Sequence, residues 1–331
     1  MPIRRVGLYC SFALLLSPVL AVSQGPSDRS EKQTTKSGNS LSSSPKAFHG
    51  RRTRDIDAIG VRNVGCNRGV GNWYSLQNQI ALGKEYSNRL EATTKLITDT
   101  EITEYINRVG QNLVRNSDAQ VPFTIKVVDS DDVNAVALPG GFFYIDSGLI
   151  LAADSEAELA GVMAHEIAHV AACHAARGRT RGQLMGIASL SMTMIGGPIA
   201  YVAYETMNMA RPFTLLRFSR KFESEADFFG VQYMYRAGYD PQALPAFFER
   251  VRAMENSKMN AVAKAFSTHP QTADRIAKTQ DEINSLLPPE TEYKVDTSEF
   301  QDVKTRLYKK ENRMGIGSSN RPTLRRRPAS D

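Results

Sequence analysis

The motif HEIAH, at residues 165–169, constrains the fold of this chain more than any other stretch of its 331 residues. Ser155 and Glu158 precede it as an S-x-x-E capping box, so a helix is expected to begin at Ser155 or one residue earlier. Alanines and other strong helix formers follow, and nothing is expected to break the helix before Gly178. On such a helix the two histidines of the motif lie on one face, about one turn apart.

Two imidazoles in this arrangement can bind a single tetrahedral Zn²⁺ ion. His165 and His169 are the predicted ligands, and Glu166 is placed to accept a proton from the water that such an ion activates. The alternative is a pair of histidines buried in a core helix, because a pattern with three fixed letters also arises by chance. The alanines around the motif leave room for an ion and a substrate, which favours metal binding.

A third ligand has to come from elsewhere in the chain. The metzincin extension of the motif requires a glycine and a further histidine, but Ala171 and Ala175 occupy those positions. His174 is expected to point away from the two ligand histidines, as a supporting or surface residue. Cys173 is a minor candidate, because thiolates are typical of closed, structural zinc sites.

A better candidate lies downstream, in the stretch FSRKFESEADFFGVQYMYRAG. Glu223 and Asp227 share one face of a predicted helix, and the small Ala226 between them allows close packing against another helix. Glu223 as third ligand completes a His₂Glu site that keeps one position open. Asp227 can then accept a hydrogen bond from the outer nitrogen of a ligating imidazole. An acidic helix face paired with Arg220 and Lys221 is the alternative.

HEIAH and ESEAD (223–227), in this order, resemble the HExxH and ExxAD motifs of the M48 family of zinc metallopeptidases. NAVALPGGFFYIDSGLI (134–150) is similar to the strand-turn-strand segment before the metal helix of that family. STHPQTADRI (267–276) is similar to its late histidine-proline segment, with His269 and Arg275 at the expected spacing.

The resemblance implies an α+β fold that is predominantly helical, a zincin-type (gluzincin-like) core with a small β-sheet beside the HExxH helix. It also implies one Zn²⁺ per chain, with Glu166 as the general base. The implied metal ligands are His165, His169 and Glu223. Asp227 would orient a ligand, and His269 would lie near the open position, as a gate or as a donor to the oxyanion.

Composition divides the chain into four parts. Residues 1–23 have the pattern of a secretory signal peptide, although a permanent membrane anchor is the alternative. Residues 24–70 are polar and basic and are predicted to form a disordered linker. The zinc peptidase domain is predicted over residues 71–290, and a polar, basic, disordered tail over 291–331.

Within the predicted domain, residues 98–117 have the periodicity of an amphipathic helix. PFTIKVVDS (122–130) and GGFFYIDSG (140–148) are typical of strands near a Pro-Gly-Gly turn. The apolar, methionine-rich segment 183–210 is interpreted as two helices that form a lid or substrate groove. Ordinary core helices and a peripheral membrane hairpin are the alternatives.

These observations predict an exported zinc endopeptidase, in the periplasm or outside the cell, that cuts unfolded or misfolded polypeptides. An extended substrate is expected to pair with an edge strand around Phe142–Asp146. One alternative is a chaperone-like protein on the same zinc fold that binds chains and cuts little. A second is a metallohydrolase that acts on substrates other than peptides.

The formal net charge of +6 is concentrated near the carboxyl end. Nucleic acid is excluded as a partner because an exported chain rarely meets it. A solvated tail is the favoured interpretation, and peripheral contact with an anionic membrane is the second. Cys66 and Cys173 stay in the exported chain, either as a disulfide or as two thiols. The sequence indicates neither the physiological substrate nor the oligomeric state.

Overall fold

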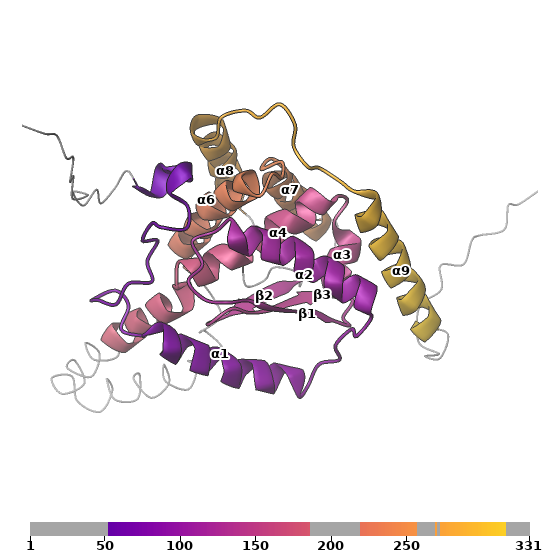
Figure 1. Ribbon diagram of the computed structural model, residues 1–331, viewed down its shortest axis with the longest axis horizontal. Coiled ribbons are helices and arrows are strands. Elements are labelled where there is room, and N and C mark those ends of the chain that lie inside the picture. The colour runs from indigo at the N-terminus through magenta and orange to yellow at the C-terminus, as the bar shows by residue number, and fades with distance from the viewer. Residues whose placement is uncertain (1–51, 186–218, 257–268, 270–271, 316–331) are drawn as a thin grey trace, which may run out of the picture. The chain divides into compact units, whose positions relative to one another are not determined.

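Three short β-strands form a mixed sheet among the helices (Figure 1). The structure is a computed structural model, and it describes residues 52–185, 219–256, 269 and 272–315. The strands are β1 (Thr124–Val128), β2 (Ala135–Leu138) and β3 (Phe142–Asp146). Their order in the sheet is β1-β3-β2, with β1 parallel and β2 antiparallel to β3. β3 is paired along both sides, so the expectation of an edge strand at Phe142–Asp146 was wrong.

The alternation of side chains along β3 gives the sheet two different faces. Phe143 and Ile145 are fully buried and join the main core, which also contains α2 (Thr100–Arg115) and α4 (Glu156–Ala171). Tyr144 belongs to a second cluster, which includes residues of α1 (Leu76–Glu91). Figure 1 accordingly shows α1 on one side of the sheet and α2 and α4 on the other.

The turn between β2 and β3 depends on two glycines. Gly140 and Gly141 have φ angles of 78° and 89°, a region that other residues rarely adopt. Helix α1 also lies very close to this turn. A β-carbon at Gly83, on this helix, would be only 1.7 Å from the carbonyl oxygen of Pro139. The sheet, the turn and α1 therefore fit together only with these small residues.

Helix α4 is buried along nearly its whole length. The hydroxyl of Ser155 accepts a hydrogen bond from the backbone N–H of Glu158, as the capping box predicts. Around α4 pack α2, α6 and α7, while α8 packs on α6 and α7. The bounds of the remaining helices between the sheet and the carboxyl end are α3 (Ser147–Ala152), α6 (Arg220–Arg236), α7 (Ala243–Asn256) and α8 (Ala273–Leu286).

The expectation of an unbroken helix up to Gly178 was wrong. Helix α4 ends at Ala171, and Cys173 has a positive φ of 52°, which turns the chain. A helix starts again at residue 174 and is described up to residue 185. Cys173 forms a disulfide with Cys66, so a contact far apart in the sequence accompanies the break.

Ordered structure extends beyond the predicted domain at both ends. Two short 3₁₀ helices, Arg52–Arg54 and Ile56–Ala58, lie in the predicted linker. Arg62 follows them, and its buried guanidinium pairs with Asp118 at 2.8 Å. The segment before residue 70 is therefore held to the core by a specific ion pair, which composition did not predict.

The predicted disordered tail over 291–331 contains helix α9 (Ser298–Gly315). Phe300, Val303 and Leu307 form an apolar stripe on this helix, and all three are buried. Helix α9 contacts α2 and α3 through this face. Charged residues between the apolar ones gave the segment a polar average, which explains why composition indicated disorder.

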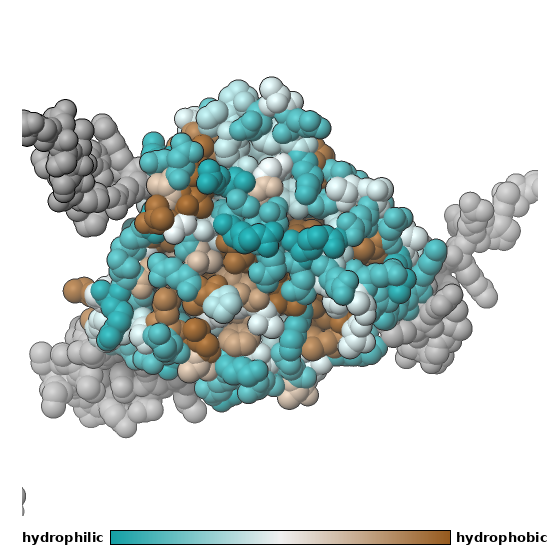
Figure 2. Space-filling model, in the orientation of Figure 1, coloured by the Kyte–Doolittle hydropathy of each residue, from teal (hydrophilic) through white to brown (hydrophobic). Residues whose placement is uncertain are grey.

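Several predictions concern residues outside those that the structure describes. These are the signal peptide, most of the linker, most of the apolar segment 183–210 and the end of the tail. Among the described residues, none of the helices has both the length and the apolar character needed to span a bilayer. On the face drawn in Figure 2, hydrophilic residues surround smaller hydrophobic areas.

Candidate metal centre

Helices α4 and α6 cross closely because small residues lie between them. A β-carbon at Gly230 would be 3.3 Å from both the nitrogen and the Cα of His165. Ala226, one turn earlier on α6, is fully buried. This close approach brings Glu223 and Asp227 of α6 next to the histidines of α4, although the two motifs are far apart in the sequence.

The three predicted metal ligands lie together. The Nε2 atoms of His165 and His169 are 3.1 Å apart. The carboxylate oxygens of Glu223 lie 3.5 Å from His165 Nε2 and 3.6 Å from His169 Nε2. With His269, these residues form a buried group whose possible ligand atoms are all within 4.8 Å of one another.

His269 reaches this group from the segment before α8. Its Nδ1 lies 3.0 Å from both carboxylate oxygens of Glu223 and 3.5 Å from His165 Nε2. Its Nε2 lies 3.6 Å from Oε1 of Glu166. The residue predicted to act as a gate or a donor is therefore in direct contact with the predicted ligands and lies beside the predicted base.

Glu166, on α4, is buried beside β2, which lies at an edge of the sheet. Its Oε2 accepts a hydrogen bond from the backbone N–H of Ala137 on β2, at 3.1 Å. Its Oε1 is buried and has no hydrogen-bond partner among the residues that the structure describes. Two imidazoles and a carboxylate are the donor set of a catalytic zinc site, and a buried carboxylate oxygen with free capacity beside them suits a general base. The residues thus fit a zinc ion.

Asp227 contacts the predicted ligand His165, and Arg275 contacts the predicted ligand Glu223. Asp227 lies 2.9 Å from Nδ1 of His165, the ring nitrogen that faces away from Glu223. Arg275 donates to Asp227 through Nε at 2.8 Å and Nη2 at 2.7 Å, and its Nη1 lies 3.1 Å from Glu223. The sequence singled out Arg275 only by its spacing from His269, and gave it no role.

The charges in this group depend on one another. Burial raises the pKa of Glu223, but hydrogen bonds with His165 and His269 outweigh it and hold that pKa well below its ordinary value. Burial lowers the pKa of His165, yet the carboxylates of Asp227 and Glu223 raise it to about 9. A metal ion that binds His165 would therefore displace a proton, so metal binding should weaken as the pH falls.

His174, which the sequence predicted to be a supporting or surface residue, lies closer to the predicted ligands than its spacing indicated. The side chain is fully buried, and its Nδ1 lies 2.9 Å from Nδ1 of His169. It was expected to point away from the ligands because the helix was assumed to continue through residue 178. The break at Cys173 places His174 against the outer nitrogen of His169 instead.

A buried HExxH helix, a glutamate from a second helix and a small adjacent sheet define the class of zincin-type metallopeptidase folds. Within that class, residues 100–283 match the profile of peptidase family M48, and the chain belongs to this family. The resemblance and the fold class inferred from the sequence are thereby confirmed.

Three relatives illustrate the similarity. The beta-barrel assembly-enhancing protease of Yersinia pestis is 30% identical over 67% of this chain and 47% of the relative. The mitochondrial metalloendopeptidase OMA1 of Schizosaccharomyces pombe is 32% identical over 60% of this chain and 56% of the relative. The metalloprotease LoiP of Escherichia coli is 25% identical over 56% of this chain and 73% of the relative. The chain spans about half the length of the beta-barrel assembly-enhancing proteases that it matches.

Proposed function

We propose that this chain is a zinc-dependent endopeptidase that cuts unfolded or misfolded polypeptides after export. The main observation behind the proposal is that the side chains of His165, His169 and Glu223 are buried close together, with Glu166 beside them. Membership of a peptidase family and relatives named as proteases support peptide bonds as the target. Export, location in the periplasm or outside the cell, and peripheral contact with an anionic membrane belong to the proposal as well.

His165, His169 and Glu223 would hold the zinc ion. A bound zinc ion would lower the pKa of water and would polarise a carbonyl group. Glu166 accepts a proton on its carboxylate and later returns it to the leaving amine, as a general base and then a general acid. Asp227 and Arg275 keep His165 and Glu223 in position throughout.

An extended substrate would pair with β2 rather than β3. Among the described residues, β2 is paired only with β3, so its other side is a sheet edge. The N–H of Ala137 on this strand already contacts Glu166, which places the edge beside the base. Backbone pairing is compatible with many substrate sequences, because its hydrogen bonds involve the main chain and not the side chains. Such a site suits a peptidase that acts on unfolded chains.

The test compares casein digestion by the zinc-loaded, full-length chain and by its Glu166→Gln variant. Loss of the base should lower the rate by about 10²–10⁴-fold. The variant should still bind zinc, because Glu166 is not one of the proposed ligands. Glu104→Gln, on the exposed face of α2, is the matched control and should digest casein normally. Equal digestion by the Glu166→Gln variant and the parent would refute the proposed role of this residue.

A chaperone-like activity is the second candidate, and the position of His269 favours it. This residue contacts Glu223 with its Nδ1 and so lies where an incoming substrate would approach the ligands. If His269 closes the site, His269→Ala should digest casein faster than the parent. If the parent prevents aggregation of unfolded protein, and neither the parent nor the His269→Ala variant digests casein, the chaperone-like function is supported in place of the peptidase.

A further inference from the structure

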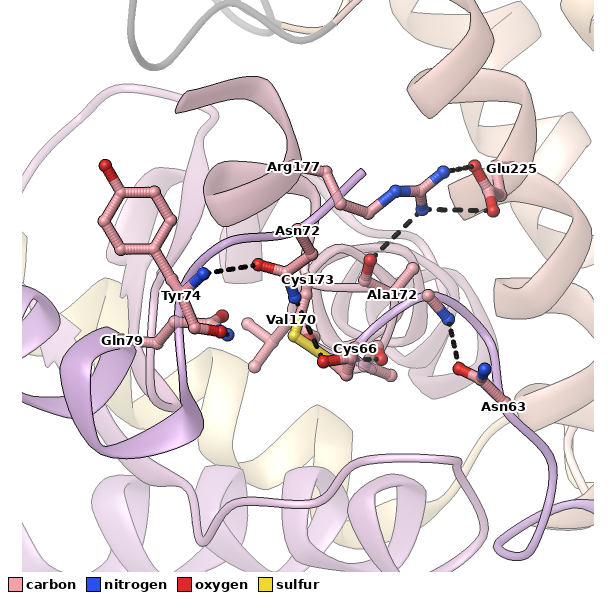
Figure 3. Close-up of a disulfide and its surroundings, with 12 residues drawn as sticks. Asn63, Cys66, Asn72, Tyr74, Gln79, Val170, Ala172, Cys173, Arg177 and Glu225 are labelled. Atoms are coloured by element: carbon pink, nitrogen blue, oxygen red, sulfur yellow. Dashed lines mark hydrogen bonds and ion pairs between the residues drawn. A yellow bond between two sulfur atoms is a disulfide. The ribbon is translucent and has the colours of Figure 1, made fainter. Parts of the chain in front are cut away.

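The disulfide between Cys66 and Cys173 joins the segment before α1 to the turn after α4, four residues beyond His169 (Figure 3). Cys173 is the residue at which the chain turns after α4, with a φ of 52°. The two cysteines are both buried, and their Cα atoms are 5.0 Å apart. The disulfide thus connects the segment before α1 to the one residue whose conformation determines where His174 is placed.

His174 is held from three directions. Its Nδ1 lies 2.9 Å from Nδ1 of His169, and its Nε2 lies 3.5 Å from Oε2 of Glu225 on α6. Its ring stacks on Phe222, with 4.5 Å between the ring centroids and 14° between the planes.

Arg177 fixes the position of Glu225. Its Nη1 and Nη2 donate to the two carboxylate oxygens at 3.2 and 3.0 Å, and Nη1 also donates to the carbonyl of Ala172 at 3.1 Å. Figure 3 shows Arg177 extending to Glu225 from the helix that follows the disulfide. The turn at Cys173 and the carboxylate on α6 are therefore joined through one side chain.

These contacts determine which ring nitrogen carries each proton. His169 directs Nε2 toward His165 and Glu223, so binding a metal there requires its proton to be on Nδ1. That N–H needs an acceptor, and Nδ1 of His174 lies within hydrogen-bonding distance of it. The proton of His174 is then on Nε2, on the side of Glu225. The two ligand histidines thus have different supports, a carboxylate for His165 and an imidazole for His169.

We propose that His174 is a positioning residue for His169, and that the Cys66–Cys173 disulfide holds it in place. His174 fixes the tautomer and ring orientation of His169, and Glu225 with Arg177 fixes those of His174. This inference rests on the proposed zinc site and concerns how tightly that site holds its ion. Groups that support ligands in this way commonly change metal affinity by about 10–100-fold.

Two substitutions at His174 distinguish the contribution of its hydrogen bond with His169 from that of its packing against Phe222. His174→Phe keeps a ring against Phe222 but has no acceptor for the N–H of His169. His174→Asn loses the stacked ring but carries an oxygen near the position of Nδ1. Zinc dissociation constants of the full-length variants would be measured by competition with a chelator, and the melting temperatures of the zinc-free proteins would show that each is folded.

We expect the dissociation constant to rise about 10–100-fold in His174→Phe and to stay near that of the parent in His174→Asn. Equal affinity in His174→Phe and the parent would overturn the inference. So would weak binding in His174→Asn together with tight binding in His174→Phe, because packing would then be the cause. A parent that binds no zinc would instead refute the proposed function, so the two failures are distinguishable.

The disulfide is tested with the double variant Cys66→Ala/Cys173→Ala. It should weaken zinc binding when His174 is present and have little further effect in the His174→Phe background, because the residue it positions is already lost. An equal effect in both backgrounds, or no effect in either, would refute the role of the disulfide in placing His174.

Discussion

Replacement of Asp227 by asparagine tests how much the candidate site depends on one buried carboxylate. Asp227 is 1% exposed, accepts two hydrogen bonds from Arg275 and lies 2.9 Å from Nδ1 of His165. Burial raises the pKa of Asp227, but His165 and Arg275 outweigh it and lower that pKa, so the group is ionised in the folded protein. An asparagine has the same shape but no charge, and its amide N–H groups would face other donors.

Two separate magnitudes follow for Asp227→Asn. Removal of one partner of a buried ion pair costs about 3–5 kcal/mol, because the other charge stays buried. Arg275 still pairs with Glu223 at 3.1 Å, so the lower end of about 3 kcal/mol is expected for the zinc-free protein. Zinc affinity should also fall by about 10–100-fold, because His165 loses the acceptor that fixes its tautomer.

Urea unfolding of the zinc-free protein measures the first effect, and chelator competition measures the second. Asp281→Asn, on the exposed face of α8, is the matched control and should change neither. The double variant Asp227→Asn/Arg275→Met should be less destabilised than the sum of the single variants, because both members of the Asp227–Arg275 pair are removed together. Unchanged unfolding free energy and zinc affinity in Asp227→Asn would refute the argument that this network holds His165.

Three further predictions concern the surrounding fold. Burial and the nearby Asp132 raise the pKa of Asp146 to about 7, so the folded state binds more protons and stability should fall between about pH 4 and 7. Urea unfolding at both ends of this range should show that Asp146→Asn removes about 2 kcal/mol of that loss, half of what the full pKa difference gives, because solvent screens this partly exposed carboxyl. Gly230→Ala should separate α4 from α6 and weaken zinc binding in chelator competition, whereas Gly182→Ala, where nothing lies within 4 Å, should not. Phe300→Ala should lower the free energy of unfolding by about 3–5 kcal/mol, because the ring is fully buried and anchors α9.

The sequence by itself determined the parts of this protein that depend on local patterns. The capping box and the alanine-rich run predicted α4, and the helical period of residues 98–117 predicted α2. Helical spacing also placed His165 and His169 on one face, and Glu223 and Asp227 on one face of α6. These features follow from the backbone geometry of a helix, which is the same wherever the helix lies.

Only the tertiary structure decided how these parts meet. Strand order, which places β2 at an edge of the sheet and β3 at its centre, depends on pairings between segments that no local period encodes. The turn at Cys173 is joined by a disulfide to a residue 107 positions away, and the helix that restarts after this turn brings His174 to His169. Helix α9 is stable because α2 and α3 cover its apolar stripe, although its average composition is polar. Each of these outcomes depends on which surfaces are buried together, and burial is a property of the whole fold.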